Sequence, residues 1–79
     1  MVSYCSTTRR LAVGSRVGHI ALYELRSSRC QLIPAHENAI TALAFSPEGK
    51  VLASFSAKDK KISFYQVSVI KVYFLSIVV

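Results

Sequence analysis

The sequence predicts an all-β fold made of four-stranded antiparallel units, with about one complete unit and three or four strands of a second. Short runs of apolar and β-branched residues alternate with turn segments rich in Gly, Pro, Ser and charged residues, which is typical of strands joined by hairpins. The connections are too short for parallel crossovers, which need a dozen or more residues. The two halves of the chain are also similar to one another.

The first half contains four expected strands, and we assign residues 1–34 to the first unit. A glycine-bounded bend at residues 14–18 is expected to need a positive φ angle. Pro34 ends the unit because it has no backbone donor for a ladder. The expected strands are residues 2–5, 11–14, 19–25 and 30–33.

The second half repeats this pattern with three strands, and we assign residues 35–66 to the second unit. Residues 40–45 are small and branched apolar residues, which favours a strand buried on both faces. The next four residues, Ser-Pro-Glu-Gly, have turn chemistry, since Pro presets one φ angle and Gly supplies a positive one. Two more strands are expected at residues 51–56 and 62–65, separated by a charged loop.

An internal repeat relates the two units. The segment L-A-V-G-S at residues 11–15 parallels L-A-S-F-S at residues 52–56, an offset of 41. The segment I-A-L-Y-E at residues 20–24 parallels I-S-F-Y-Q at residues 62–66, an offset of 42. Both offsets lie within the period of roughly 40–45 residues that marks the blades of WD40 propellers.

Residues 35–66 resemble a WD40 repeat in particular positions. Ala35-His36 stands where the family usually has Gly-His, and the Ser-Pro-Glu-Gly turn stands where it has Ser-Pro-Asp-Gly. Asp59 matches the Asp before the third strand, and Tyr65-Gln66 occupies the place of the Trp-Asp pair. The resemblance implies a propeller blade. Closed propellers have roughly four to eight blades, so two blades are expected to be a fragment or truncated isoform.

The same resemblance implies a buried hydrogen-bond network that ties the strands of the second blade together, formed by His36, Ser56, Asp59 and Tyr65. The first blade has Val17 at the Asp position and lacks the His, so it should lack the network. A Ser-His-Asp hydrolase is the alternative for these residue types. The sequence has no nucleophile elbow and no Gly-rich oxyanion loop, so we expect a structural role and no enzyme.

Charge and cysteine content narrow the classes of partner. Ten Lys and Arg against four Asp and Glu give a net charge of +6, but the basic residues are scattered through the expected turns, which makes nucleic-acid binding an unfavoured interpretation. Cys5 and Cys30 do not form a disulfide framework, and a reducing compartment fits them best. Together with His19 and His36 they lack the spacing of a zinc site, so neither metal nor cofactor is predicted.

The apolar tail at residues 67–79 departs from the family. Its Val, Ile, Tyr and Phe favour a strand, and it falls where the fourth strand of the second blade belongs. It could instead be non-native sequence after a splice or reading change, or a membrane segment. Its 13 residues include Lys71, whereas a helical span needs about 20 apolar residues.

A more specific resemblance involves the segments I-A-L-Y-E-L-R at residues 20–26, A-I-T-A-L-A-F-S-P-E-G-K at 39–50 and K-I-S-F-Y-Q at 61–66. They are similar to the C-terminal propeller of the rabconnectin beta-chain family, over residues 1–66 but not the tail. This implies a non-catalytic protein–protein interaction scaffold linked to vesicle trafficking and regulation of the vacuolar proton pump. The implied partners are proton-pump subunits or a rabconnectin alpha-type chain, and the implied location is cytoplasmic, peripheral on vesicle or endosomal membranes.

Two other interpretations stay open. The chain could be a small basic protein that associates with membranes through its apolar tail. It could also be a truncated or misspliced product without independent function.

Overall fold

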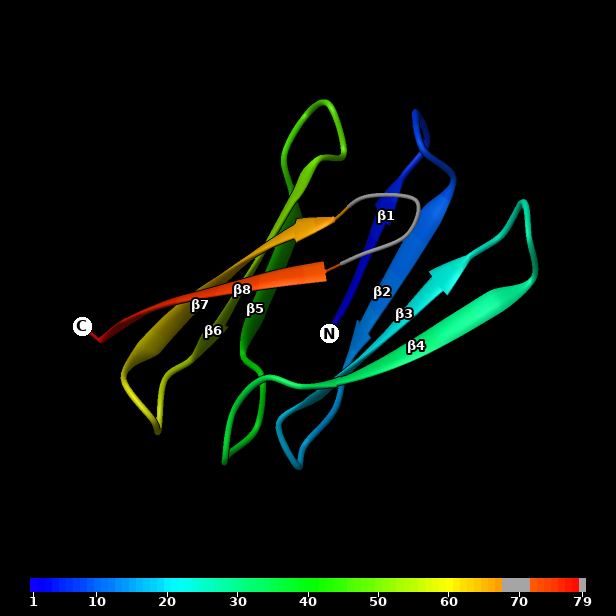
Figure 1. Ribbon diagram of the computed structural model, residues 1–79. Coiled ribbons are helices and arrows are strands. Elements are labelled where there is room, and N and C mark those ends of the chain that lie inside the picture. Colours follow the sequence, from blue (N-terminus) through cyan, green and yellow to red (C-terminus); the bar gives the residue numbers. More distant parts are fainter. Residues whose placement is uncertain (68–71, 79) are drawn as a thin grey trace.

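The computed structural model describes residues 1–67 and 72–78, and the side chains of residues 1–67. These residues form eight strands in two four-stranded antiparallel sheets (Figure 1). Each sheet is a meander in which strands consecutive in the chain are hydrogen-bonded neighbours. The first sheet contains β1 (Val2–Cys5), β2 (Arg10–Gly14), β3 (His19–Glu24) and β4 (Arg29–Pro34). The second contains β5 (Ala42–Phe45), β6 (Val51–Ser56), β7 (Lys61–Val67) and β8 (Val72–Val78).

The predicted all-β class and its four-stranded antiparallel units are confirmed. β8 lies in the apolar tail and pairs antiparallel with β7, with Tyr65 opposite Phe74. The predictions for tail residues 68–71 and 79 lie outside the described residues. Within the described part of the chain, no helix has the length and apolar character of a membrane span.

The expectation that residues 40–45 form a strand buried on both faces is wrong. β5 begins only at Ala42, and its exposure alternates, with Ala42 and Ala44 exposed and Leu43 and Phe45 half-buried. The reason is its position, since β5 is the edge strand of the second sheet and only one of that sheet's faces is covered by the first. Ile40 is buried, but it lies in the connection before the strand.

Positive φ angles recur in the turns. Three four-residue hairpin turns each end on a residue with a positive φ angle. These residues are Arg9 (φ 53°) before β2, Ser28 (φ 55°) before β4 and Lys60 (φ 55°) before β7. The expected glycine conformations are also present, with φ 88° at Gly18 and 76° at Gly49. The left-handed region is open to Gly without steric cost, so these two turns depend on glycine.

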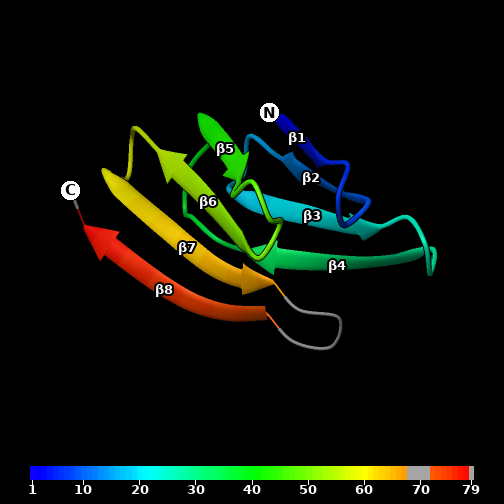
Figure 2. The same cartoon turned by 90° about the horizontal axis from the view of Figure 1, so that it is seen from above.

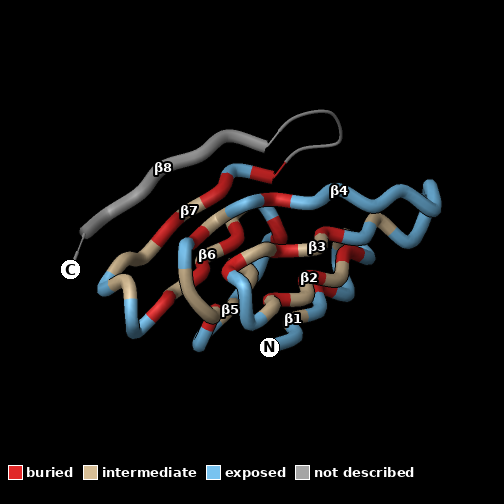
Figure 3. The backbone as a smooth tube through the Cα atoms, turned by 90° about the horizontal axis from the view of Figure 1, so that it is seen from below, coloured by how far each residue is buried: buried red, intermediate tan, exposed pale blue. Residues whose placement is uncertain are grey.

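The core lies between the two sheets, which stack face to face (Figure 2). Successive side chains of a strand point to opposite faces of the sheet. Each sheet therefore has an inner face, toward the other sheet, and an outer face, away from it. Buried apolar residues lie on β2, β3 and β4 of the first sheet and on β6 and β7 of the second, and Figure 3 colours the buried residues red along these strands. The buried core residues are Ala12, Ile20, Leu22, Ile33, Ile40, Leu52, Tyr65 and Val67.

The bend between β2 and β3 joins the two sheets through the backbone. The carbonyl of Gly18 accepts hydrogen bonds from the amides of Ala35 (3.1 Å) and His36 (2.9 Å). The carbonyl of Ser15, in the same bend, accepts one from the amide of Ile40 (3.1 Å). The segment that connects the two sheets, residues 35–41, is therefore fixed at both ends, and we call it the connection. Its position places the His36 side chain against the second sheet.

Candidate functional site

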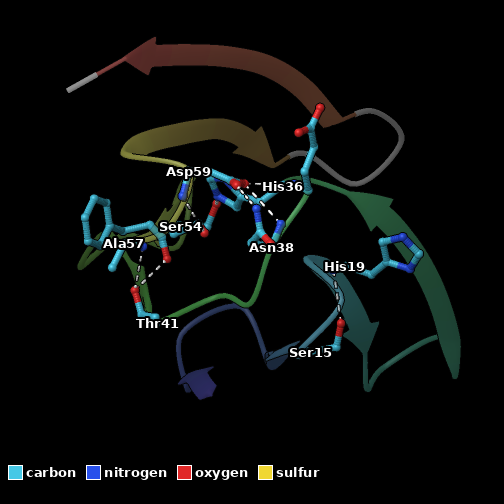
Figure 4. A network of polar contacts seen from close by, with 11 residues as sticks. Ser15, His19, His36, Asn38, Thr41, Ser54, Ala57 and Asp59 are labelled. Atoms are coloured by element: carbon cyan, nitrogen blue, oxygen red, sulfur yellow. Dashed lines mark hydrogen bonds and ion pairs between the residues drawn. The ribbon is translucent and has the colours of Figure 1, made fainter.

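His36 is the centre of a buried polar network between the connection and the second sheet (Figure 4). Its Nε2 atom lies 2.8 Å from the hydroxyl of Ser54, on the inner face of β6. Ser54 pairs across the ladder with Ser63 of β7, and both serines are 1% exposed. The β6–β7 register therefore brings two hydroxyl groups to one buried point beside the imidazole.

Tyr65 extends this network along β7. It is fully buried and lies on the same face as Ser63, two residues earlier. Burial raises the pKa of Tyr65, and hydrogen bonds with the hydroxyls of Ser63 and Ser54 lower it by less. The phenol therefore stays neutral, and Ser54 connects the imidazole of His36 to the hydroxyl of Tyr65.

Asp59 closes the other side of the network from the turn after β6. Its carboxylate accepts hydrogen bonds from the amides of Glu37 (2.8 Å) and Asn38 (3.2 Å) and from the side-chain amide of Asn38. The side-chain bond from Asn38 is the largest cause that lowers the pKa of Asp59, so this group remains charged. The β6–β7 turn is thereby tied to the connection that carries His36.

The imidazole and the carboxylate do not form an ion pair at neutral pH. His36 Nδ1 lies 3.9 Å from Asp59 Oδ2, which is beyond hydrogen-bond distance. Burial lowers the pKa of His36, and the attraction of Asp59 only partly offsets that effect. His36 is therefore neutral in the folded chain, and the contact orders the two side chains without a full charge on the ring.

The structure brings His36, Asp59 and Tyr65 into one network. The predicted Ser56 does not contact His36 in it, and its neighbour on the same face, Ser54, does. Ser56 is fully buried, and its hydroxyl accepts a hydrogen bond of 3.4 Å from the amide of Asp59. The hydroxyl beside His36 belongs to Ser54. Sequence reasoning missed Ser54, Ser63 and Asn38. The alternation of β6 indicates that Ser54 and Ser56 share a face, but it cannot choose between them.

This arrangement holds the blade together and is poorly suited to catalysis. The Ser54 hydroxyl is enclosed between the sheets and is shared with Tyr65, so a substrate cannot reach it. A groove of about 260 Å³ lies elsewhere, between the β1–β2 turn and the end of β5. Within the described residues, no three His, Cys, Asp or Glu side chains gather as metal ligands would.

The Ser54→Ala substitution should lower the free energy of unfolding by about 1–3 kcal/mol, because it leaves buried groups of His36 and Tyr65 short of a partner. Urea unfolding followed by circular dichroism measures this change. Ser27→Ala, in the exposed β3–β4 turn, is the control and should stay within about 0.5 kcal/mol of the parent. A Ser54→Ala chain as stable as this control would contradict the network.

Acidification should destabilise the chain in two steps. Because the pKa of His36 is lowered on folding, its contribution is complete above the usual His pKa of about 6.5 and is lost as the pH falls toward the folded value. The pKa of Asp59 is also lowered, so a second loss begins below about pH 4. The melting temperature between pH 7.5 and 3.5 measures both steps.

The variant His36→Gln should remove the first step and keep the second. His19→Gln, which replaces the other histidine, should keep both steps and serves as the control. A melting temperature that rises between pH 7 and pH 5 would show that the sign of the His36 effect is wrong.

Comparison with known proteins decides the family. The profile described as "Anaphase-promoting complex subunit 4 WD40 domain" matches residues 2–76. The chain belongs to the WD40-repeat family. The two sheets are consistent with WD40 blades, and His36, Asp59 and Tyr65 lie in the polar network of the second sheet. WD40 repeats are typically non-catalytic, in agreement with the prediction that this chain is not an enzyme.

Several WD40 relatives are similar over most of this chain. It is 32% identical over 66 residues to "WD repeat-containing protein SL1-17" of Schistosoma mansoni, covering 84% of this chain and 22% of that protein. It is 34% identical over 65 residues to "SVP1-like protein 2" of Neurospora crassa, covering 81% and 15%. It is 42% identical over 57 residues to "Nuclear distribution protein PAC1" of Tuber melanosporum, covering 72% and 12%. The chain therefore spans less than a quarter of the length of these relatives.

Proposed function

We propose that the chain is a piece of a non-catalytic WD40 scaffold that binds other proteins. The observation that carries the proposal is the WD40 match over residues 2–76, together with a polar network whose contacts serve packing. Fold alone does not identify a partner. The partner must therefore be argued from the surface that the blades present.

Three turns form a basic surface at one end of the two sheets, and we call it the basic end. They are the β1–β2, β3–β4 and β5–β6 turns, which lie at the same end of the meanders (Figure 1). Glu48 reaches the ammonium of Lys50 at 3.8 Å, so it neutralises only that cation. The exposed cations there are Arg9, Arg26, Arg29 and Lys50. An acidic protein surface is the partner that this charge favours.

The resemblance to the rabconnectin beta-chain propeller supports a finer proposal. In it the chain works on the cytoplasmic side of vesicle or endosomal membranes, within a scaffold that regulates the vacuolar proton pump. Its partners are then proton-pump subunits or a rabconnectin alpha-type chain. None of the relatives named above is a rabconnectin, so this proposal depends on the segments at residues 20–26, 39–50 and 61–66.

The test is binding of the purified chain to the purified cytoplasmic sector of the vacuolar proton pump, measured by biolayer interferometry. The double variant Arg26→Glu/Arg29→Glu should weaken binding at least about tenfold if the basic end makes the contact. Arg16→Glu/Lys58→Glu makes the same charge change at the opposite end and should leave binding unchanged.

Equal weakening by both double variants would indicate nonspecific charge attraction, and no binding at all would exclude the proton-pump partner. Flotation with phosphatidylserine vesicles tests the alternative that the chain binds membranes through its apolar tail. Lipid binding that disappears when residues 67–79 are removed, without binding to the pump sector, would replace the scaffold proposal.

A further inference from the structure

A groove of about 260 Å³ opens at the basic end, between the two sheets. Residues 3–7 form one wall, at the end of β1 and in the turn that follows it. Residues 44–47 form the other wall, at the end of β5 and in the turn that follows that strand. β1 and β5 lie side by side (Figure 2), so both walls of the groove belong to this chain.

The two turns beside the groove are in direct contact, which fixes the distance between its walls. Gly49 is buried, and a Cβ atom added to it would lie 2.6 Å from Cγ2 of Thr8 and 2.7 Å from Sγ of Cys5. The backbone of the β5–β6 turn therefore packs on side chains of β1 and of the β1–β2 turn. A groove held in this way exists before a ligand binds, which lowers the cost of binding.

Hydroxyl groups make up much of the polar lining, from Ser3, Ser6, Thr7 and Ser46. Ser6 and Thr7 are exposed, so a ligand can reach them. The Oγ atom of Ser46 accepts a hydrogen bond of 3.1 Å from the amide of Val51, and its own proton can still be donated to a ligand. Several hydroxyl donors around one groove suit the oxygen atoms of carboxylates.

The apolar part of the lining includes the half-buried Phe45 and the exposed Pro47. Phe45 packs against the core that the two sheets share, so its ring is a fixed surface for an apolar side chain of a ligand. The groove is smaller than the roughly 300–1,000 Å³ of small-molecule pockets. Its size suits one or two side chains of a peptide better than a cofactor.

Exposed cations lie in the same two turns as the lining. Arg9 follows Thr7 by two residues, and Lys50 follows Pro47 by three. Glu48 reaches Lys50 at 3.8 Å, so Arg9 is the stronger attraction for an anion here. Cations beside hydroxyl donors favour a ligand with several carboxylates.

We propose that this groove binds an extended acidic segment of a partner protein. The segment places one apolar side chain against Phe45 and Pro47 and its carboxylates beside the hydroxyl groups and Arg9. The inference rests on the proposed function as a protein-binding scaffold, and it adds the chemistry of the partner and the place where it binds. A nucleic acid needs a series of aromatic rings on which successive bases stack, and a groove of this volume has no room for such a row.

Fluorescence anisotropy of the full chain with a short fluorescein-labelled peptide, in which Glu and Leu alternate, tests the proposal. We expect saturable binding with a dissociation constant tighter than about 1 mM, and weaker binding as the salt concentration rises. A peptide in which Glu and Ser alternate should bind at least about tenfold more weakly, because it has no apolar side chain for the groove. Equal binding of the two peptides would overturn the proposal, since charge alone would then explain it.

Variants that fill the groove without changing its charge locate the binding site. Ser3→Phe should weaken binding of the Glu–Leu peptide at least about tenfold. Ser27→Phe makes the same change in the exposed β3–β4 turn, outside the groove, and should bind like the parent chain. Thr7→Phe, in the exposed turn, repeats the test if Ser3→Phe loses its β-sheet circular dichroism. Unchanged binding by a folded groove variant would overturn the proposal.

The peptide and the proton-pump sector together distinguish failure of this inference from failure of the proposed function. If the pump sector binds but the Glu–Leu peptide does not, the groove inference is wrong and the scaffold proposal stands. If the peptide binds and Ser3→Phe weakens it while the pump sector does not bind, the groove is supported and only the proton-pump partner is excluded. A thymidine oligonucleotide that binds more tightly than the peptide and displaces it would overturn the inference in favour of nucleic acid.

Discussion

The variant Gly18→Ala should be destabilised by about 2–6 kcal/mol. This value is the sum of two costs, that of holding a non-glycine residue at positive φ and that of an overpacked contact. Gly18 has a φ of 88°, and a Cβ atom there would lie 2.0 Å from the carbonyl oxygen of His36. That oxygen belongs to the backbone and cannot rotate away as a side chain would. The same glycine accepts the hydrogen bonds from Ala35 and His36, so the clash would also displace the connection between the blades.

Thermal and urea unfolding of the Gly18→Ala chain measure this effect. The core of a domain this small rarely supplies more than about 3–5 kcal/mol, so we expect the variant to be largely unfolded at 25 °C. Gly14→Ala is the graded control, because the atoms nearest its added Cβ belong to the side chain of Ile40, the closest at 2.8 Å, and its φ is not positive. Equal stability of the two variants would contradict the packing of the bend against the connection.

The variant Tyr65→Ala should lose about 3–5 kcal/mol, the cost of removing a buried aromatic side chain and leaving a cavity. Tyr65 is fully buried in the core that the two blades share, and its hydroxyl bonds with the serines of the network. Tyr65→Phe keeps the ring and removes the hydroxyl, so it should cost about 1–3 kcal/mol. The two variants together separate the packing effect from the polar effect.

Tyr23→Ala is the matched control for Tyr65→Ala, because Tyr23 occupies the equivalent position of the first blade. It lies on the outer face and is 39% exposed, so in dilute solution its loss should cost less than about 1 kcal/mol. Urea unfolding of all three variants measures the differences. If Tyr23→Ala and Tyr65→Ala lost equal stability, the assignment of inner and outer faces would be incorrect.

The sequence predicts the strands well because their signal is local. Hairpin turns and apolar alternation occur within a few residues of one another, and the 41- and 42-residue offsets confirm the pattern in the second half. The expectation for residues 40–45 failed because burial of β5 depends on which face the other blade covers. That information is tertiary and is not contained in the composition of the segment.

The residues of the polar network could also be predicted from the sequence only in part. The resemblance predicted His36, Asp59 and Tyr65 from their neighbours in the chain, and the structure places these three side chains close together. The choice of Ser54 over Ser56 depends on the β6–β7 register and on the path of the connection, and both result from long-range contacts. The Gly18–His36 contact likewise joins residues of different blades.

Residue-by-residue amide hydrogen exchange of the full chain tests most directly whether two WD40 blades share one core. Amides of β2, β3, β6 and β7 should exchange slowest, with similar opening free energies in both sheets, because the blades unfold as one cooperative unit. Amides of the β3–β4 turn should exchange much faster. Protection confined to one sheet, or fast exchange throughout both, would contradict the account.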